Sequence, residues 1–546
     1  MLANRDSATA MSGRVERTAD TPVAHWAFRH PLLISLVLGA LAALGFPPLR
    51  WWPVALLAMG AFVWVLRRVT TPGRAFLVGW LFGVAHYTVT NNWIAHAFTY
   101  QAEMPAWLGW MAVPLLSLYL AVYPGLAAMA AHLLARRGGP VAFALAFAAA
   151  WIVAEWLKSW VFTGYAWGPF SLALLGSFER PGLAAVLPLF GTYALSGLAV
   201  LIAAMVVRLL IERRFAVFTL IAFALAVGML LPAFGPAREG TLPVTLVQPN
   251  VPQDEIDNPA LYEQQFRNIA QLSATYKPRQ RRLVLWPESG LPDYLRYGYP
   301  QRYYDQMTAA GDPRFARWRI GQAIGENSVL LTGAVDLEIG EQPTGYPRAV
   351  GAYNGVTALD GAGNILTSYY KAHLVPYGEY LALRWLLEPL GATRLVAGAL
   401  DFIPGPGPET LPLGAWGEVG VQICYEIIFS GNVIDPNNRP DYLFNPSNDG
   451  WFGAWGPPQH FAQARMRAIE EGVPVLRATT TGISGVIDAR GVVRQRLPQH
   501  VAGRIDTLVP PANKPTLFSR MGHWLTATWA ILFFALSAVA LRRTRG

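Results

Sequence analysis

The sequence has very few cysteines and few charged residues, and both shortages limit what the protein can be. Cys424 is the only cysteine among 546 residues, which excludes an internal disulfide and a zinc site built on cysteine pairs. Only 14% of the residues are charged, against about 25% in an average soluble domain. Glycine-rich phosphate loops and solenoid-type repeats are also lacking. These absences argue against a wholly soluble protein, a P-loop nucleotide-binding protein and a repeat protein.

The charge that is present is basic, with a formal net charge of +9. A basic balance can indicate nucleic-acid binding. Here, however, the arginines cluster at the ends of apolar runs, where membrane topology explains them. We therefore expect a membrane, and no nucleic acid, as the partner of the basic residues.

Hydrophobic residues make up 53% of the chain and are concentrated in long runs. Most of the runs approach the ~20 residues that a helix needs to cross a bilayer, and the first two are shorter. The sequence predicts an α-helical membrane bundle of about eight spans, with seven in residues 30–236 and one in 521–541. Residues 1–29 are polar and are expected to form a cytoplasmic tail. The runs cover 31–46, 52–66, 75–98, 107–135, 141–160, 186–207, 215–234 and 521–541.

Arginines mark alternate connections between these runs, and this asymmetry predicts orientation. Cytoplasmic loops carry an excess of Lys and Arg, so the marked loops and both termini are expected inside the cell. The seventh span then leaves on the other side, which makes residues 240–512 extracytoplasmic. The marking residues are Arg67, Arg68 and Arg74, then Arg136 and Arg137, then Arg208, Arg213 and Arg214, and finally Arg542, Arg543 and Arg545.

Residues 240–512 alternate strand-like and helix-like patterns. Strands are expected at 243–248, 282–286, 329–335, 353–359, 365–370, 420–423, 441–444, 475–479 and 485–487. Helices are expected at 259–276, 312–326 and 459–472. Turn sequences at 360–363 and 488–491 indicate hairpins, so the pattern predicts a layered α/β domain with a mixed sheet.

Three residues at the ends of strand-like runs could together perform acyl transfer. Cys424 would attack an acyl carbonyl and form a thioester. Glu288 would accept the thiol proton and return it to the leaving group, and Lys371 would stabilise the oxyanion. This chemistry requires no metal and no cofactor. The alternative for a lone cysteine is a small buried hydrophobic residue.

Several motifs resemble a known family. Trp286-Pro-Glu288, Lys371-Ala-His-Leu-Val-Pro-Tyr-Gly-Glu379 and Cys424-Tyr-Glu426 are similar to the motifs of the nitrilase superfamily. With Asn445-Pro-Ser-Asn-Asp-Gly-Trp-Phe-Gly453 and the flanking spans, the chain resembles the membrane-embedded apolipoprotein N-acyltransferase family. The resemblance implies an αββα nitrilase-like (carbon–nitrogen hydrolase) domain over residues 240–512, on the periplasmic side of a bacterial inner membrane. It also implies transfer of a fatty acyl chain from a phospholipid to the N-terminal amine of the S-diacylglyceryl-cysteine of lipoproteins.

The same resemblance assigns further residues. It makes Glu288, Lys371 and Cys424 the catalytic triad and adds Glu379, Tyr425 and Glu426 as supporting residues. Trp451 and Phe452, in a glycine-flanked loop, are expected to contact an acyl chain or the bilayer.

Two other functions stay open at this point. A membrane-tethered nitrilase-like amidase would hydrolyse its thioester, and a transport protein would use the outer domain only for binding. Glu155 and Lys158, near the end of one span, either pair with each other or have a functional role.

Overall fold

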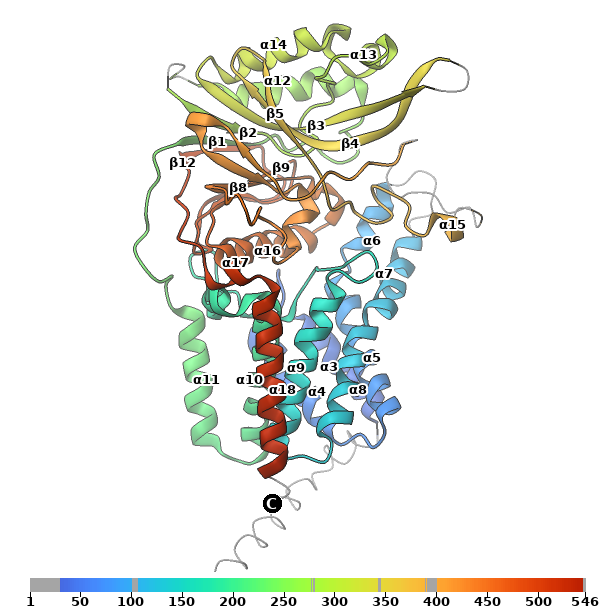
Figure 1. Cartoon of the computed structure of the whole chain (residues 1–546), viewed down its shortest axis with the longest axis vertical. Helices are drawn as coiled ribbons and strands as arrows, with labels where there is room; N and C mark the ends of the chain where they lie inside the picture. Colours follow the sequence, from blue (N-terminus) through green and yellow to red (C-terminus); the bar gives the residue numbers. More distant parts are fainter. Residues whose placement is uncertain are drawn as a thin grey trace, which may run out of the picture.

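The computed structural model of the chain describes residues 30–100, 107–275, 277, 280–341, 345–387, 389 and 400–543. The expected tail 1–29 lies outside the described residues. Figure 1 shows a bundle of roughly parallel helices at one end and an α/β sandwich at the other.

Each expected apolar run contains a helix of the bundle. Among the described residues, four stretches are long and apolar enough to cross a membrane, at 107–135, 140–158, 183–211 and 523–543, and three further apolar helices are shorter. The helices are α3 (Pro31–Ala43), α4 (Trp52–Arg67), α5 (Pro72–Thr90), α7 (Trp107–Leu120), α8 (Val122–Ala135), α9 (Pro140–Lys158), α10 (Leu187–Ile211), α11 (Phe215–Leu230) and α18 (His523–Arg543).

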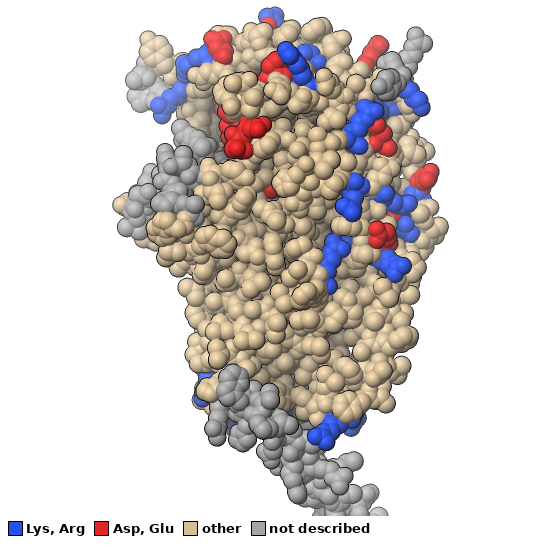
Figure 2. Space-filling model, turned by 180° about the vertical axis from the view of Figure 1, so that it is seen from behind, with Lys and Arg blue, Asp and Glu red and all other residues tan. Residues whose placement is uncertain are grey.

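Small residues allow these helices to pack closely. A Cβ added to Gly60 of α4 would lie 2.2 Å from the carbonyl oxygen of Ala203 on α10. Gly39 of α3 approaches the carbonyl of Phe82 on α5 equally closely. Such contacts are typical of helices that associate in lipid, where close backbone approach replaces the hydrophobic effect. In Figure 2, an uncharged band separates the charged sandwich from the basic end of the bundle.

The sandwich consists of two six-stranded mixed sheets. The first has the order β12-β1-β2-β3-β4-β5, and the second has the order β11-β10-β9-β8-β7-β6. The strands are β1 (Pro243–Gln248), β2 (Arg282–Leu285), β3 (Ser328–Glu341), β4 (Pro347–Asp360), β5 (Ile365–Tyr370), β6 (Thr410–Pro412), β7 (Glu418–Val421), β8 (Tyr442–Ser447), β9 (Val475–Thr479), β10 (Ser484–Ile487), β11 (Val493–Leu497) and β12 (Gly503–Leu508).

Helices cover both outer faces of the sandwich. Apolar side chains such as Leu285 and Phe444 fill the space between the sheets. Helices α12 (Tyr262–Ser273) and α14 (Pro313–Ile324) pack on the first sheet, through residues such as Ile320. Helix α16 (Gly456–Glu471) packs on the second sheet and also contacts the bundle. The layers therefore follow the expected αββα order.

The expected elements differ from the observed ones in two ways. The expected span 75–98 is interrupted, because α5 ends at Thr90 and only the short α6 (Ile94–Ala97) follows the polar pair Asn91-Asn92. Strands β6, β11 and β12 were not predicted, and all three are edge strands. Edge strands are short or charged, as in Val493-Arg-Gln-Arg-Leu497, so they lack the apolar pattern of central strands.

Candidate active site

Glu288, Lys371 and Cys424 lie in segments that directly follow strands of both sheets. Glu288 comes three residues after β2, Lys371 immediately after β5, and Cys424 three residues after β7. All three side chains are buried. The Nζ atom of Lys371 lies 3.0 Å from Oε1 of Glu379 and 3.7 Å from Oε1 of Glu288. The fold therefore brings together residues that are up to 136 positions apart in the chain.

The backbone at Cys424 has an unusual conformation. Its φ of +49° lies in the left-handed region, at the start of the 3₁₀ helix η8 (Cys424–Ile428). A non-glycine residue there costs about 1–2 kcal/mol, and surrounding contacts must hold it. Its carbonyl oxygen accepts hydrogen bonds from Nε2 of His460 at 2.9 Å and from Nδ2 of Asn445 at 3.4 Å. These two donors fix the turn that presents the thiol.

The electrostatic environment favours the protonated form of the Cys424 thiol. Burial raises the pKa of Cys424 well above its ordinary value, and the negative charge of Glu288 raises it further. The positive charge of Lys371 acts in the opposite direction but is outweighed. A thiol in this state needs a base before it can attack a carbonyl group, and the charge of the Glu288 carboxylate acts on Cys424.

Lys371 is held as a cation. Burial alone would lower the pKa of Lys371, but the carboxylates of Glu379 and Glu288 outweigh burial and raise it above its ordinary value. Glu379 is itself fixed, because its Oε2 accepts a hydrogen bond of 2.8 Å from the backbone N–H of Val375. The ammonium is therefore a fixed positive charge and hydrogen-bond donor at this site.

Asn354, on β4, was not singled out from the sequence. Its Nδ2 group donates hydrogen bonds of 2.8 Å to Oε1 of Glu288 and to Oε1 of Glu379. The second oxygen of Glu288 accepts a hydrogen bond of 2.9 Å from the backbone N–H of Asn448. Asn354 thus separates two carboxylates that would otherwise repel each other. The sequence signal that could have identified Asn354 is an asparagine within a strand of small and apolar residues.

Glu426 connects the lysine segment to the cysteine segment. Its Oε1 accepts hydrogen bonds from the backbone N–H groups of Ala372 and His373, at 2.8 Å and 3.1 Å, and from the hydroxyl of Tyr369. Its Oε2 accepts a hydrogen bond of 2.8 Å from the N–H of Ile423. Burial raises the pKa of Glu426 to about 7. The residue therefore positions Lys371 and Cys424 relative to each other.

A buried ionic network lies behind the cysteine turn. Asp449 forms an ion pair with Arg477 at 2.8 Å, and its Oδ1 lies 3.0 Å from Nδ1 of His460. Burial tends to raise the pKa of Asp449, but Arg477 and His460 outweigh it and lower that pKa. Because His460 also donates to the carbonyl of Cys424, this network supports the backbone turn at Cys424. A charged residue within the apolar strand Val475–Thr479 was its only sequence signal.

The aromatic residues predicted to contact lipid lie where the sandwich meets the bundle. Phe452 packs against Trp93 and Trp167, with ring centroids 4.7 Å and 5.7 Å apart, and Trp451 packs against Tyr100 at 5.7 Å. Tyr425 is buried beside Phe429 and His373. Trp451 and Phe452 thus contact the bundle, whereas Tyr425 belongs to the core around η8.

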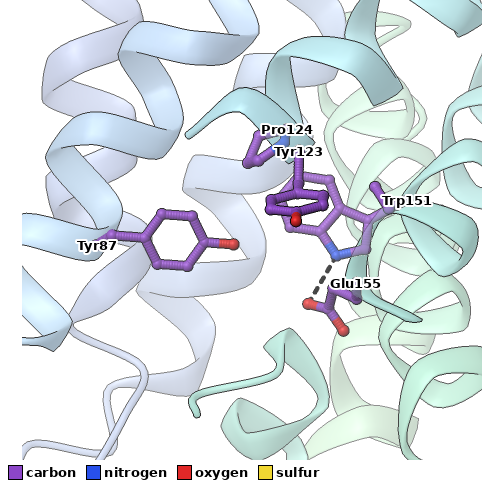
Figure 3. A pocket seen from close by; sticks show the side chains of 6 residues that line it. Tyr87, Tyr123, Pro124, Trp151 and Glu155 are labelled. Carbon is purple, nitrogen blue, oxygen red and sulfur yellow. Dashed lines mark hydrogen bonds between the residues drawn. The ribbon is translucent and has the colours of Figure 1, made fainter. Parts of the chain in front are cut away.

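Glu155 and Lys158 hold a backbone segment, rather than each other. Oε1 of Glu155 accepts hydrogen bonds from Nε1 of Trp151 and from the N–H of Phe170; Figure 3 shows the first of these bonds. Nζ of Lys158 donates to the carbonyl oxygens of Tyr165 and Trp167 at 3.0 Å each. No ion pair links the two side chains within the described residues. Both residues therefore order the segment 165–170, which contacts α16.

In the described part of the chain, no group of three or more His, Cys, Asp or Glu side chains is arranged to hold a metal ion. The site is organised by one lysine and buried carboxylates. Its geometry suits attack by a thiol on a carbonyl group, with a neighbouring base and a fixed cation.

Two family models match large parts of the chain. Residues 38–205 match the apolipoprotein N-acyltransferase N-terminal domain, and residues 244–510 match the carbon-nitrogen hydrolase family. Among solved structures, a mutant of the Nesterenkonia AN1 amidase from the nitrilase superfamily is 18% identical, with a TM-score of 0.35. That match covers 54% of this chain and all of the amidase.

Relatives match over nearly the whole length. The apolipoprotein N-acyltransferase of Rhodopseudomonas palustris is 34% identical and that of Bradyrhizobium diazoefficiens is 33% identical. Each match covers 97% of this chain and 98% of the relative. Full-length similarity to acyltransferases disfavours the tethered amidase and the transport protein. The chain therefore belongs to the apolipoprotein N-acyltransferase family.

Proposed function

We propose that this membrane enzyme N-acylates lipoproteins in two half-reactions that share the thiol of Cys424. The acyl donor is a membrane phospholipid, and the acceptor is the N-terminal amine of an S-diacylglyceryl-cysteine. The observation that carries this proposal is the meeting of a buried thiol, a carboxylate and a fixed ammonium group at strand ends of two facing sheets.

In the first half-reaction, Cys424 attacks an ester carbonyl of the phospholipid and a carbon–sulfur bond forms. Glu288 takes the thiol proton, and the ammonium of Lys371 stabilises the oxyanion. The ester carbon–oxygen bond then breaks, and Glu288 returns the proton to the glycerol oxygen. A lysophospholipid leaves and a thioester remains.

In the second half-reaction, the lipoprotein amine attacks the thioester. An α-amine has a pKa of about 8, so a useful fraction is neutral near pH 7. Glu288 accepts a proton from the amine while a carbon–nitrogen bond forms and the carbon–sulfur bond breaks. The proton then returns to the thiolate of Cys424, which restores the free enzyme.

The supporting residues keep this site in place. Glu379 anchors the ammonium of Lys371, and Glu426 ties the two catalytic segments together. Tyr425 packs beside the nucleophile. Trp451 and Phe452 lie against the bundle, which suits contact with an acyl chain that enters from the bilayer.

The proposed setting is a bacterial inner membrane, crossed about eight times. Residues 30–236 form seven spans and 521–541 the last, while residues 240–512 form the catalytic domain on the periplasmic side. The uncharged band in Figure 2 and the arginines at the far end of the bundle support this orientation.

Intact-protein mass spectrometry after incubation with phospholipid tests the first half-reaction. The wild-type chain should gain one acyl chain on Cys424, and Cys424→Ala should gain none. Glu288→Gln should slow adduct formation by ~10²–10⁴-fold through loss of the general base. Lys371→Met should slow it by ~10²–10³-fold through loss of the oxyanion donor. Lys514→Met, an exposed lysine, serves as the control and should leave the rate unchanged.

The fate of the thioester tests the second half-reaction. The thioester should persist in buffer and should disappear quickly when a diacylglyceryl-cysteine peptide is added. The same peptide with an acetylated amine should leave the thioester intact. Equal decay with the free peptide, the acetylated peptide and buffer alone would show that water is the acceptor, and the transferase mechanism would be wrong.

A further inference from the structure

A groove lies between helices α9 and α18 of the bundle. Helix α9 contributes Ile152 and Trp156, and α18 contributes Thr526, Ala530 and Phe534. The groove has a volume of about 160 Å³ and an almost wholly apolar lining. We call it the α9–α18 groove. Ile531, also in its lining, is two-thirds exposed, so the groove opens toward the surface of the bundle.

Two polar atoms in this apolar groove have no hydrogen-bond partner among the described residues. They are Oγ1 of Thr526 and Nδ1 of His523, and both atoms are buried. Thr526 as a whole is only 2% exposed. The two residues are three positions apart, so they lie on the same face of α18. An unsatisfied buried polar group costs about 1–3 kcal/mol, which a ligand with suitable groups would recover.

Other hydroxyl groups of α18 show that Thr526 is exceptional. Oγ1 of Thr528 donates to the carbonyl of Trp524 at 2.8 Å, and Oγ of Ser537 donates to the carbonyl of Ala142 at 2.7 Å. In apolar surroundings a threonine hydroxyl normally bonds to a backbone carbonyl in this way. Thr526 has no such bond, so its donor remains available inside the groove.

From Arg520 to Phe534 the chain presents a basic, then polar, then apolar side chains, and a glycerophospholipid carries its phosphate, ester and acyl chain in the corresponding order. Arg520, on the preceding helix α17 (Leu517–Met521), is exposed and basic. His523 and Thr526 follow with their unpartnered polar atoms, and Ala530 and Phe534 then provide an apolar channel. Trp524, 80% exposed at the start of α18, suits the boundary between water and lipid. A lipid phosphate, a glycerol ester and an acyl chain occur in the same order.

We propose that the α9–α18 groove is a binding site for one membrane glycerophospholipid. One acyl chain lies along Ala530 and Phe534, the ester carbonyl accepts a hydrogen bond from Thr526, and the phosphate faces Arg520. The site is separate from Cys424 and does not depend on the identity of the acyl donor.

The site adjoins the segment that follows the candidate nucleophile. A Cβ added to Gly431 would lie 2.8 Å from Nε2 of His523, so the imidazole packs directly on that glycine. Ser430 and Gly431 follow η8, the helix that starts at Cys424. His523 also packs against the rings of Trp156 and Tyr193. A bound lipid would therefore fill the space beside a junction of α9, α10, α18 and the sandwich.

Photolabelling of the full chain tests this site. The probe is a phosphatidylglycerol with a diazirine in one acyl chain, used with Cys424→Ala so that the probe is not consumed by acyl transfer. We expect labelled residues on α9 and α18 in peptides that line the groove. Thr526→Val, which preserves shape, should weaken binding about fivefold, the net value of one hydrogen bond. Ala530→Trp should fill the channel and remove most of the labelling.

Matched controls make the result decisive. Thr528→Val removes a hydroxyl from the same helix outside the groove, and Leu536→Trp adds bulk at an exposed position outside it. Both should label like the parent chain. The proposal is overturned if Thr526→Val binds like Thr528→Val, if palmitate competes as well as phosphatidylglycerol, or if the label lies away from α9 and α18. None of these outcomes bears on thioester formation at Cys424.

Discussion

At the candidate site, the positive charge of Lys371 is balanced by neighbouring carboxylates. A further carboxyl group, that of Glu426, has a raised pKa. Lys371 lies between the carboxylates of Glu288 and Glu379, and Asn354 donates to both carboxylates. Glu426 lies on the other side and accepts hydrogen bonds from the backbone on both sides of the site. Because burial raises the pKa of Glu426 to about 7, this positioning residue changes charge near neutral pH.

Acidification should slow acylation through Glu426. As the pH falls below about 7 the carboxylate gains a proton, and its oxygens then accept the N–H groups of Ala372 and Ile423 less well. Glu426→Gln should be ~10–100-fold slower, because charge-assisted hydrogen bonds are lost, and should lack this part of the pH dependence. The measurement is the rate of adduct formation on Cys424 between pH 6 and pH 8. Glu471→Gln, another buried carboxyl group with a pKa of about 7, should keep the wild-type profile.

The same group should affect stability in the opposite direction. The pKa of Glu426 is higher in the folded state than its ordinary value of 4.5, so the folded state binds the proton more tightly. Its contribution to the free energy of unfolding should therefore rise by about 3 kcal/mol as the pH falls from 7 to 4.5. Thermal midpoints of the wild type and Glu426→Gln across this range provide the check. A difference that grows with pH in favour of the wild type would contradict the assignment.

Asn354 should be needed to keep two carboxylates beside one lysine. Asn354→Asp replaces its shared donor with a third negative charge, which repels Glu288 and Glu379. We expect adduct formation to fall by ~10²-fold or more, since two hydrogen bonds to charged groups are lost. Asn364→Asp, in the exposed turn that follows the same strand, controls for added charge. An Asn354→Asp enzyme that kept the wild-type rate would show that the carboxylates need no such donor.

Among the elements, α16 joins the catalytic sandwich to the bundle. On the bundle side, Oε1 of Gln459 accepts a hydrogen bond from Trp167, and Glu470 accepts one from the N–H of Thr192. Arg465 is fully buried and donates to four carbonyl oxygens, those of Gly176, Ser177, Arg180 and Gly491. The helix that carries His460 toward the cysteine turn is therefore also the main connection to the bundle.

Loss of Arg465 should loosen this connection. Arg465→Met keeps much of the side-chain volume but leaves buried carbonyl oxygens without donors, at about 1–3 kcal/mol each. We expect a lower thermal midpoint and faster proteolysis in the 176–180 loop. Arg494→Met, which removes a partly exposed ion pair with Asp488, should change the midpoint little, because such pairs contribute about 0–1 kcal/mol. Equal effects of the two substitutions would mean that α16 does not depend on Arg465.

At the scale of the whole molecule, the sequence predicts those elements whose surroundings require a regular pattern of apolar residues. The apolar helices were predictable because lipid requires continuous apolar runs, and central strands such as β2 were predictable because both faces are buried. Glu288, Lys371 and Cys424 could be selected because each ends such a run. Asn354 and the Asp449–Arg477 pair could not be selected from the sequence, because their partners come from distant strands. A single buried polar residue also leaves no periodic pattern. Edge strand β11 was missed for a similar reason, because its exposed residues are charged.

Orientation in the membrane is the remaining whole-molecule prediction. The basic residues at the end of the bundle opposite the sandwich predict that this end lies in the cytoplasm. A reporter that is active only in the cytoplasm should give signal when fused after Gly546 or after Arg137. The same reporter inserted between Glu341 and Gly345, in the connection from β3 to β4, should be silent. A periplasmic reporter at the same positions should give the inverse pattern. Cytoplasmic signal from the β3–β4 insertion would place the sandwich inside the cell and would contradict the proposed periplasmic position of the catalytic domain.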